Sequence, residues 1–545
     1  MNSRMRLAKS GSLVSVVAIL LAVASAGCRT SYGDGPYTAI AVPSEKTRAI
    51  DTLDLSAMSA PAGEPETPVA APLGSTEVSL TLDQARAAAL AHNLDIKVAL
   101  IDPAISAESI NQEEARFEAL FFSQLGYTDL DSPSFSDPDA GKLETVSADP
   151  GVQVPLKTGG TVTLDVPMTR FTSPLAKDYS TGFSASIIQP LLRGAGVRAN
   201  THAIRVACYS TKISEAQTKL EVIRVIAAAD RVYWRLYAAK RALTVRRNEY
   251  DLAVAQLERA RRRVAAGAAS EVEVIRAETG VGDSTETVIV AENAVRQRER
   301  DLKRTLNIPG LAVDTTTVVI PATEPDPVRY DLDNARLVKA ALDNRMEMLS
   351  LELQIAQDLS SIDFQRNAAL PLLALDYTYN VNGIGETLED SVDLLTDKRF
   401  EDHSLGLRLE VPLGNRAARS RLHQAIYTRV QRLATREARR LQIQQEVLDA
   451  ADQLKTNWQR VLANRQRAVL ASRNLDAEVR QFELGLRTST DVFQAQTRLG
   501  DAQLAEITSL TEYQIAQVDL AFATGTLLGA AKVHWQPTVP PANSK

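Results

Sequence analysis

The sequence has few of the residues that build disulfide frameworks, metal centres and catalytic sites. Its 545 residues include 2 cysteines and 5 histidines, and none of them has the spacing that is typical of a metal site. No HExxH, GxSxG or P-loop motif occurs, and we find no nucleophile with a neighbouring base. We therefore predict no catalytic residues, no metal and no cofactor, and we do not expect an enzyme.

The sequence also has no excess of basic residues and few long hydrophobic runs. The net charge of -6 gives no reason to expect nucleic-acid binding. The main apolar run, Leu13 to Ala26, follows the positive residues Arg4, Arg6 and Lys9. It is shorter than the roughly 20 residues that span a bilayer, so it favours a secretory signal peptide over residues 1–27.

The apolar run ends in Ser25-Ala26-Gly27-Cys28, which resembles the lipobox of bacterial lipoproteins, with Ser25 where leucine is usual. The resemblance implies that Cys28 carries acyl chains such as palmitate. One chain alone binds a membrane marginally and several bind it firmly, so Cys28 would be an anchor. The alternative is an ordinary cleavage site followed by a chance cysteine. Residues 28–76 are rich in Pro, Ala, Ser, Thr and Glu and predict an extended tether.

The two halves of the remaining chain repeat each other. Leu82-Asp83-Gln84-Ala85-Arg86 recurs as Leu332-Asp333-Asn334-Ala335-Arg336, and Gln189-Pro190-Leu191 corresponds to Val411-Pro412-Leu413. The two segments of the first half are separated by more residues than their counterparts in the second half. The difference predicts about one extra hairpin in the first half, with its turn at Thr158-Gly159-Gly160-Thr161. We assign repeat one to residues 77–323, repeat two to residues 324–530 and a C-terminal tail to residues 531–545.

Two stretches predict unusually long helices. Residues 201–266 and 416–484 contain neither proline nor glycine and are rich in strong helix formers. At 1.5 Å per residue each would be on the order of 100 Å long, whereas ordinary globular helices have about 8–20 residues. A narrow apolar stripe in the second stretch predicts coiled-coil-like packing with wet faces. The stripe consists of Leu441, Val447, Leu448, Leu454, Trp458, Val461 and Leu462.

Each long helix is followed by a glycine and a further helical segment, which predicts the tip of a helical hairpin. Gly267 and Gly485 would supply left-handed caps, and Ser270 or Thr490 could cap the next helix. We place the two tips at about residues 264–272 and 482–491.

Other segments alternate between apolar and polar residues, which predicts strands. Leu405 to Leu413 alternates strictly, Leu375 to Val381 does so with aromatic residues, Phe183 to Pro190 is a weaker example, and residues 120–129 are ambiguous. This pattern fits a membrane β-barrel with lipid outside and water inside, although a soluble sheet over a core would give the same pattern.

About two principal strands per repeat, or four per chain, cannot close a barrel. Open strand edges are not tolerated in lipid. Several chains must therefore contribute to one barrel, and cyclic symmetry follows.

The predicted elements follow the order helix, strand, turn, strand, long helix, tip, helix, and this order occurs twice. It resembles that of the TolC-like outer membrane factor family over roughly residues 77–530. The motifs that carry the resemblance are Leu80 to Ala85 at the start of a repeat, Pro190 to Gly196 and Val411 to Arg416 at strand-to-helix turns, and Gly485 to Gln496 at a periplasmic tip.

The resemblance implies an α/β membrane channel. Three chains would form a 12-stranded β-barrel in the outer membrane, from four principal strands each, above a periplasmic coiled-coil barrel of duplicated α-helical hairpins. The homotrimer would be a passive exit duct of a tripartite efflux or type I secretion system. Its partners would be outer-membrane lipid, a periplasmic adaptor (membrane fusion) protein at the tips and an inner-membrane transporter.

The resemblance also assigns roles to residues of the tips. Gly267 and Gly485, with Arg487, would dock the adaptor, and Asp491 would belong to the tunnel gate. Gln494 fills the second gate position, and Glu273 is the equivalent of Asp491 in repeat one.

Two readings of these acidic residues stay open. A ring of carboxylates at a constriction would favour cations and depend on salt. Alternatively, both acids are solvated residues in the first turn of a helix, where acids are favoured. Arg487 could also pair with a carboxylate across the tip.

A second hypothesis fits much of the same pattern. A periplasmic coiled-coil scaffold or adaptor with a small β domain would have similar helices and no membrane barrel. The two hypotheses differ in what covers the apolar face of the strands: lipid in a channel, the protein's own core in a scaffold.

Overall fold

The computed structural model describes residues 77–131, 142–173 and 176–531. The predicted signal peptide, Cys28 and the tether up to residue 76 lie outside these residues, as does the tail from residue 532 onward. Among the helices within the described ranges, none has both the length and the apolar character needed to cross a bilayer.

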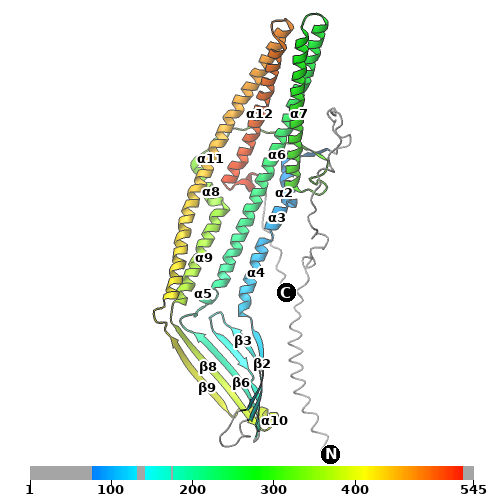
Figure 1. The fold of residues 1–545 in the computed structure, drawn as a ribbon. Helices are drawn as coiled ribbons and strands as arrows, with labels where there is room; N and C mark the ends of the chain where they lie inside the picture. Colours follow the sequence, from blue (N-terminus) through cyan, green and yellow to red (C-terminus); the bar gives the residue numbers. More distant parts are fainter. Residues whose placement is uncertain (1–76, 132–141, 174–175, 532–545) are drawn as a thin grey trace, which may run out of the picture. The chain divides into compact units, whose positions relative to one another are not determined.

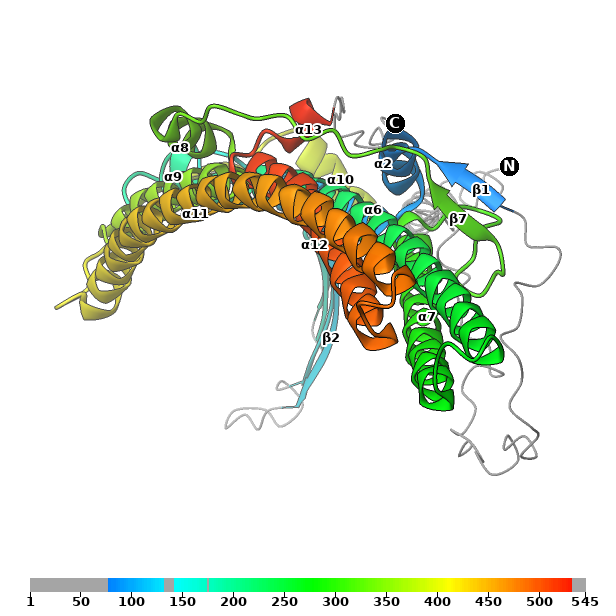
Figure 2. The same cartoon turned by 90° about the horizontal axis from the view of Figure 1, so that it is seen from above.

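Two long helical hairpins dominate the fold (Figure 1). In the first, α6 (His202–Ala265) turns back into α7 (Glu271–Leu306). In the second, α11 (Arg416–Glu483) turns back into α12 (Ser489–Ala523). α6 has 64 residues and α11 has 68, which confirms both predicted long helices. The hairpins stand side by side in one curved layer (Figure 2), and α6 contacts α12 where the hairpins meet.

The buried seam of α11 follows a seven-residue repeat through Leu454, Val461, Ala468, Leu475 and Phe482. A repeat of this period keeps the seam facing its neighbour when the helices supercoil with a left hand.

The apolar stripe predicted for α11 is wrong in part. Val447, Leu454 and Val461 are buried, but Leu441, Leu448 and Leu462 are 66%, 38% and 53% exposed. The exposed residues also recur at multiples of seven positions. They form a second seam beside the buried one, and we call them the free seam of α11.

Shorter elements pack against the long helices and complete the layer. The helices are α2 (Leu82–His92), α3 (Leu94–Ala99), α4 (Asp102–Glu114), η3 (Ala115–Phe117), α5 (Val197–Asn200), α8 (Asn334–Asn344), α9 (Met346–Ala368) and α13 (Leu527–Ala530). The parallel strands β1 (Glu77–Leu80) and β7 (Val318–Pro321) form a separate two-stranded sheet. The largest core lies here, between α2, α6 and α7, and includes Ile226, Tyr233, Leu302 and Leu306.

A buried ion pair joins α2 to α6 within this core region. Asp230 is fully buried, and Arg86 donates to both of its carboxylate oxygens, from Nε and Nη2, at 2.8 Å each. Burial raises the pKa of Asp230, and the hydrogen bonds and charge of Arg86 oppose that shift. Without Arg86, the buried Asp230 carboxylate would lower the stability of the fold, because an unpaired buried charge is costly.

A seven-stranded sheet lies at the end of the layer opposite the hairpin turns (Figure 1). Its strand order is β2-β3-β4-β6-β8-β9. The strand β5 continues β4 along the same line between β3 and β6, because it pairs with both of them, so the seven strands occupy six positions in the sheet. All neighbours are antiparallel. The strands are β2 (Leu120–Asp131), β3 (Lys142–Pro155), β4 (Thr161–Asp165), β5 (Met168–Thr172), β6 (Lys177–Pro190), β8 (Leu372–Gly385) and β9 (Glu401–Glu410).

These strands include the four principal strands expected from the sequence, as β2, β6, β8 and β9, and residues 120–129 belong to β2. The predicted extra hairpin corresponds to β3 and the β4–β5 pair. It lies inside the sheet between β2 and β6, and β2 has no pairing with β6. The strand expected to reach Leu413 ends at Glu410 instead, because Pro412 has no N–H to continue a ladder.

The strand register places apolar side chains on one face of the sheet. Leu375 pairs with Leu407 and Tyr377 with Leu405 across β8 and β9, while Ile187 of β6 pairs with Tyr377. The opposite face has Asp376, Thr378 and Arg408 on the same strands. We call these the apolar face and the polar face of the sheet.

A short helix, α10 (Leu388–Thr396), covers the far end of the apolar face. Ser391 Oγ lies 2.7 Å from Thr181 Oγ1 of β6, and α10 also packs on β8. Gly383 of β8 makes this packing possible, because a Cβ there would collide with the backbone of Ser391.

Candidate functional site

The two hairpin turns have the same backbone geometry. Gly267 and Gly485 have φ values of 72° and 76°, which glycine adopts without strain. In each turn the glycine N–H and the next N–H donate back to carbonyls of the last helical turn, at 2.9 to 3.0 Å. This is the Schellman arrangement. A Cβ at either glycine would meet nothing within 4 Å, so the requirement for glycine at these positions comes from the backbone alone.

The helices that leave the turns begin differently. Ser270 is the N-cap residue of α7, but its side chain makes no capping hydrogen bond. The cap of α12 is Thr488 and not Thr490 as predicted: Thr488 Oγ1 accepts from the Asp491 N–H, and the Asp491 carboxylate accepts from the Thr488 N–H at 2.9 Å. Hydrogen bonds from Thr488 lower the pKa of Asp491. The proposed gate residue thus also forms a capping box.

Glu273 connects the two tips. Its Oε2 accepts from the Ser489 N–H at 3.2 Å, so an acid of repeat one holds the first N–H of α12 in repeat two. Its Oε1 pairs with Arg276 at 2.9 Å. Hydrogen bonding from Ser489 lowers the pKa of Glu273, and Arg276 adds to the shift. The carboxylate is therefore charged at neutral pH, and its negative charge interacts favourably with the positive N-terminal end of the α12 dipole.

A second contact crosses between the tips nearby. Arg263 of α6 donates from Nη1 to the Phe482 carbonyl of α11 at 3.3 Å, and its guanidinium lies 4.6 Å from the centre of the Phe482 ring. Phe482 is buried. We call the Glu273–Ser489 and Arg263–Phe482 contacts the tip latch. Neither Arg263 nor Phe482 could be predicted from the sequence, because nothing local to either residue indicates a partner in the other repeat.

The remaining predicted residues lie around this latch. Arg487 pairs with Glu478 at 3.2 Å and donates to Gln481 at 2.9 Å. It therefore pairs with a carboxylate of its own hairpin and not of the other one. Gln494 is exposed, one turn beyond Asp491 on α12. A cavity of about 180 Å³ lies between the tips and is lined by Arg263, Glu273, Phe482, Arg487 and Ser489 among others.

Apolar side chains project from the tips into solvent. Leu484 and Leu486 flank Gly485 and are 75% and 72% exposed, and Val272 in the first turn of α7 is 52% exposed. Clustered exposed apolar residues beside polar ones are typical of a surface that meets a protein partner.

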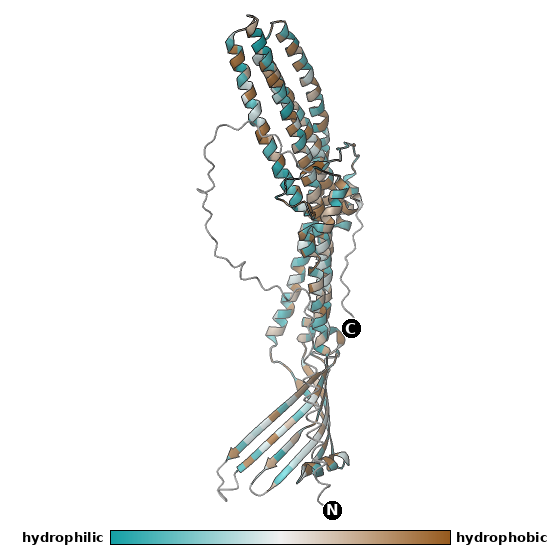
Figure 3. Cartoon of the chain, turned by 90° about the vertical axis from the view of Figure 1, so that its right-hand side faces the viewer, coloured by the Kyte–Doolittle hydropathy of each residue, from teal (hydrophilic) through white to brown (hydrophobic). Residues whose placement is uncertain are grey.

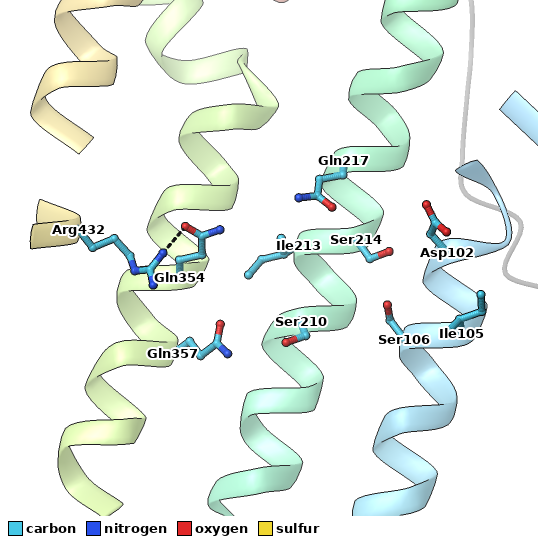
Figure 4. Close-up of a pocket in the computed structure, with 10 residues that line it drawn as sticks. All are labelled: Asp102, Ile105, Ser106, Ser210, Ile213, Ser214, Gln217, Gln354, Gln357 and Arg432. Carbon is cyan, nitrogen blue, oxygen red and sulfur yellow. Dashed lines mark hydrogen bonds between the residues drawn. The ribbon is translucent and has the colours of Figure 1, made fainter. Parts of the chain in front are cut away.

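A second hollow lies farther along the layer (Figure 4). About 480 Å³ in volume, it is bordered by α4, α6, α9 and α11, and glutamine and serine side chains dominate its lining. Arg432 of α11 donates to Gln354 and Asp358 of α9 at 2.6 Å each and closes one side. Its polar lining is suited to water more than to an apolar ligand. Among the residues that the structure describes, no three His, Cys, Asp or Glu side chains are grouped as a metal site.

Comparisons with known proteins agree with this geometry. Residues 337–526 match the family described as Outer membrane efflux protein. The chain is 24% identical over 305 residues to Outer membrane protein TolC of Vibrio cholerae serotype O1, a match that covers 54% of this chain and 66% of that protein, just under two thirds.

Solved structures with the same fold cover more of the chain. The outer membrane protein VceC from Vibrio cholerae aligns with a TM-score of 0.61 at 15% identity, over 82% of this chain and 96% of that one. A membrane protein from Pseudomonas aeruginosa aligns with a TM-score of 0.64 at 18% identity, over 86% and 97% of the two chains.

Proposed function

We propose that this chain, whose second repeat belongs to the outer membrane efflux protein family and whose fold is that of the TolC-type channels, is one of three identical subunits of an outer-membrane exit duct. One observation carries the proposal: the sheet exposes its apolar face. Leu405, Leu407 and Leu409 of β9 are 74%, 65% and 62% exposed. Leucines at this density on one strand face favour lipid as their surroundings.

The unpaired strand edges support a shared barrel. β2 and β9 are the outer strands of the sheet, and in lipid each unpaired N–H and C=O costs several kcal/mol. Copies of the chain that pair edge to edge around a symmetry axis would satisfy both edges. The free seam of α11 supports the same assembly, because Leu441, Leu448 and Leu462 would pack against a helix of the neighbouring subunit.

The scaffold hypothesis accounts less well for the sheet. A soluble β domain would cover its apolar face with its own helices, whereas α10 covers only the far end of that face here. Figure 3 shows apolar residues along the strands at the end of the layer away from the helical tips.

We assign the sheet to the outer membrane and the helical hairpins to the periplasm, with lipid on Cys28 as an additional anchor. The tips would meet a periplasmic adaptor protein through Gly267, Gly485, Arg487 and the exposed apolar residues beside them. A passive duct does not hydrolyse nucleotides, which agrees with the lack of nucleotide-binding motifs in the sequence. The energy for transport would therefore come from an inner-membrane transporter.

We assign the gate to the tips, at Asp491, Gln494 and Glu273. In a trimer, Asp491 and Gln494 of three subunits would surround the axis, where carboxylates favour cations. The tip latch would hold each first hairpin against the second and keep this constriction narrow. Opening would then require the Glu273–Ser489 contact to break.

The experiment that tests this function is conductance of the purified protein in planar lipid bilayers. We expect a low-conductance channel, and a higher conductance for Glu273→Ala because the latch loses its bond to the α12 N-terminus. Glu278→Ala is the matched control, since Glu278 pairs with Arg261 of its own hairpin. Absence of any channel would contradict the duct, and equal conductance of the two variants would contradict the latch.

The same measurement has a pH dependence of known sign. The pKa of Glu273 lies below its ordinary value of 4.5, so the latch is intact at neutral pH and weakens as pH falls through that lowered pKa. Conductance should rise on acidification in the wild type. The rise that belongs to Glu273 should be missing in Glu273→Ala, whereas any change caused by protonation of Asp491 should be the same in both proteins.

A further inference from the structure

We propose that all six positions of the large sheet lie in the wall of the barrel, so that three chains close an 18-stranded barrel and not a 12-stranded one. The inference rests on the proposed trimeric channel. It depends on where the extra hairpin, β3 with the β4–β5 pair, is placed. A 12-stranded wall would need β2 to pair directly with β6 and the hairpin to stand outside the wall.

The pairing of the strands places the hairpin in the wall. β2 pairs with β3 along its whole length, from Leu120 opposite Gln153 to Asp131 opposite Lys142. β3 pairs in turn with β4 and β5, and both of these pair with β6. Removing the hairpin from the wall would break both ladders and leave β2 and β6 to form a new one.

The chemistry of the hairpin matches that of the other strands. Across the register, the residues of the hairpin that share the apolar face are themselves apolar over most of its length: Val146, Ala148, Val152 and Val154 of β3, Val162 and Leu164 of β4, and Met168 of β5. The opposite face of the same strands has mostly polar residues, namely Thr145, Ser147, Gln153, Thr163 and Asp165, with Leu143 and Phe171 as apolar exceptions towards the far end. A hairpin surrounded by water in the lumen would not need one apolar face, whereas a strand between lipid and water does.

Charges appear on the apolar face only towards the far end of the hairpin. Glu144 of β3 and Arg170 of β5 pair there at 2.7 Å, close to the end at which α10 lies on β6 and β8. A band of apolar residues that gives way to an ion pair fits the rim of a membrane wall.

Every position is long enough to cross a bilayer. β9 has 10 residues, β2 has 12, and β3, β6 and β8 have 14 each, while about 9–11 residues suffice for a transmembrane strand. β4 and β5 form one further position, interrupted at Pro167. The ladder continues past the interruption, since the Val166 N–H donates to Pro150 and the Gly182 N–H to Pro167, at 2.9 and 2.8 Å.

The number of positions also allows closure. Six antiparallel positions leave β2 and β9 pointing in opposite directions, so β9 of one chain can continue the antiparallel ladder with β2 of the next. Barrel diameter grows roughly linearly with strand number, so the wall would be about 1.5 times as wide as that of a 12-stranded barrel. A second copy of this chain is therefore the partner of each edge.

The test uses cysteine pairs in the protein as it stands in the outer membrane, in a Cys208→Ser background. Tyr127→Cys with Val146→Cys joins β2 to β3. Tyr127→Cys with cysteine at Phe183, Ala185 or Ile187 in turn tests a direct β2–β6 neighbourhood. Ala185→Cys with Tyr379→Cys is the positive control, because β6 and β8 are neighbours in either wall. Adjacent antiparallel residues lie within disulfide reach.

We expect a disulfide between positions 127 and 146, and none between position 127 and β6. A disulfide between position 127 and β6 would overturn the proposal. So would the absence of the 127–146 disulfide when the control pair forms.

A second readout locates the hairpin relative to lipid. A bimane fluorophore on Val152→Cys of β3 should be quenched by brominated phospholipid, and one on Gln153→Cys should not. A fluorophore on Leu407→Cys of β9 reports on the proposed function by itself. Quenching at position 407 but not at 152 would overturn the six-position wall alone, whereas no quenching at 407 would overturn the membrane channel.

Discussion

Leu405→Arg should prevent or severely weaken assembly of the trimer in the outer membrane. Leu405 lies on the apolar face of β9 and is 74% exposed in the single chain. An arginine on the lipid face of a barrel costs about 2–4 kcal/mol near the bilayer midplane, and a threefold assembly carries that cost three times. The measurement is the amount of heat-modifiable, detergent-resistant trimer in outer-membrane fractions.

Ser404→Arg is the control for this variant. Ser404 is the preceding residue of β9, at nearly the same depth, and it lies on the polar face opposite Thr378. There the guanidinium would be in the water of the lumen, so we expect near-normal trimer levels. Equal loss in both variants would show that the strand is sensitive to bulk or charge on either face, and the assignment of lipid to the apolar face would then be wrong.

Arg86→Ala should cost about 3–5 kcal/mol in the free energy of unfolding. Its partner Asp230 is fully buried, and both carboxylate oxygens depend on the Arg86 guanidinium. Removing the arginine leaves an uncompensated carboxylate between α2 and α6. The measurement is a urea titration of the detergent-solubilised protein, monitored by far-ultraviolet circular dichroism.

The pH dependence of this variant separates charge from lost packing. Burial already raises the pKa of Asp230 above its ordinary value of 3.8, and loss of Arg86 should raise it further. A carboxyl group with a raised folded-state pKa destabilises the fold when ionised and ceases to do so as pH falls. The deficit of Arg86→Ala should therefore shrink in acid. The double variant Arg86→Met, Asp230→Leu should recover much of the stability at neutral pH, and a deficit unchanged by either would contradict the ion-pair account.

Much of the helical architecture follows from short-range rules, and so it could be predicted. The absence of proline and glycine over 416–484 agrees with α11, which runs from Arg416 to Glu483. Gly267 and Gly485 end the long helices because a left-handed residue is needed at those positions. The alternation in Leu405 to Glu410 likewise reflects the two faces of one strand.

Features that depend on packing between distant segments could not be read in this way. The phase of the α11 seam was missed because leucines such as Leu441 and Leu462 line a second face, and apolar character does not tell the two faces apart. Glu273 faces Ser489 only because the two hairpins lie side by side. No local signal in residues 142–172 indicates that the hairpin of β3 and the β4–β5 pair is inserted in the sheet between β2 and β6.

The most direct test of the central claim is membrane fractionation of Cys28→Ser. This substitution removes the proposed lipid anchor and leaves the strands intact. If three chains share a barrel in the outer membrane, the variant will stay in that fraction through a urea or carbonate wash and need detergent for release as a trimer. A variant that the wash releases as a water-soluble monomer would contradict the channel and favour a tethered periplasmic scaffold.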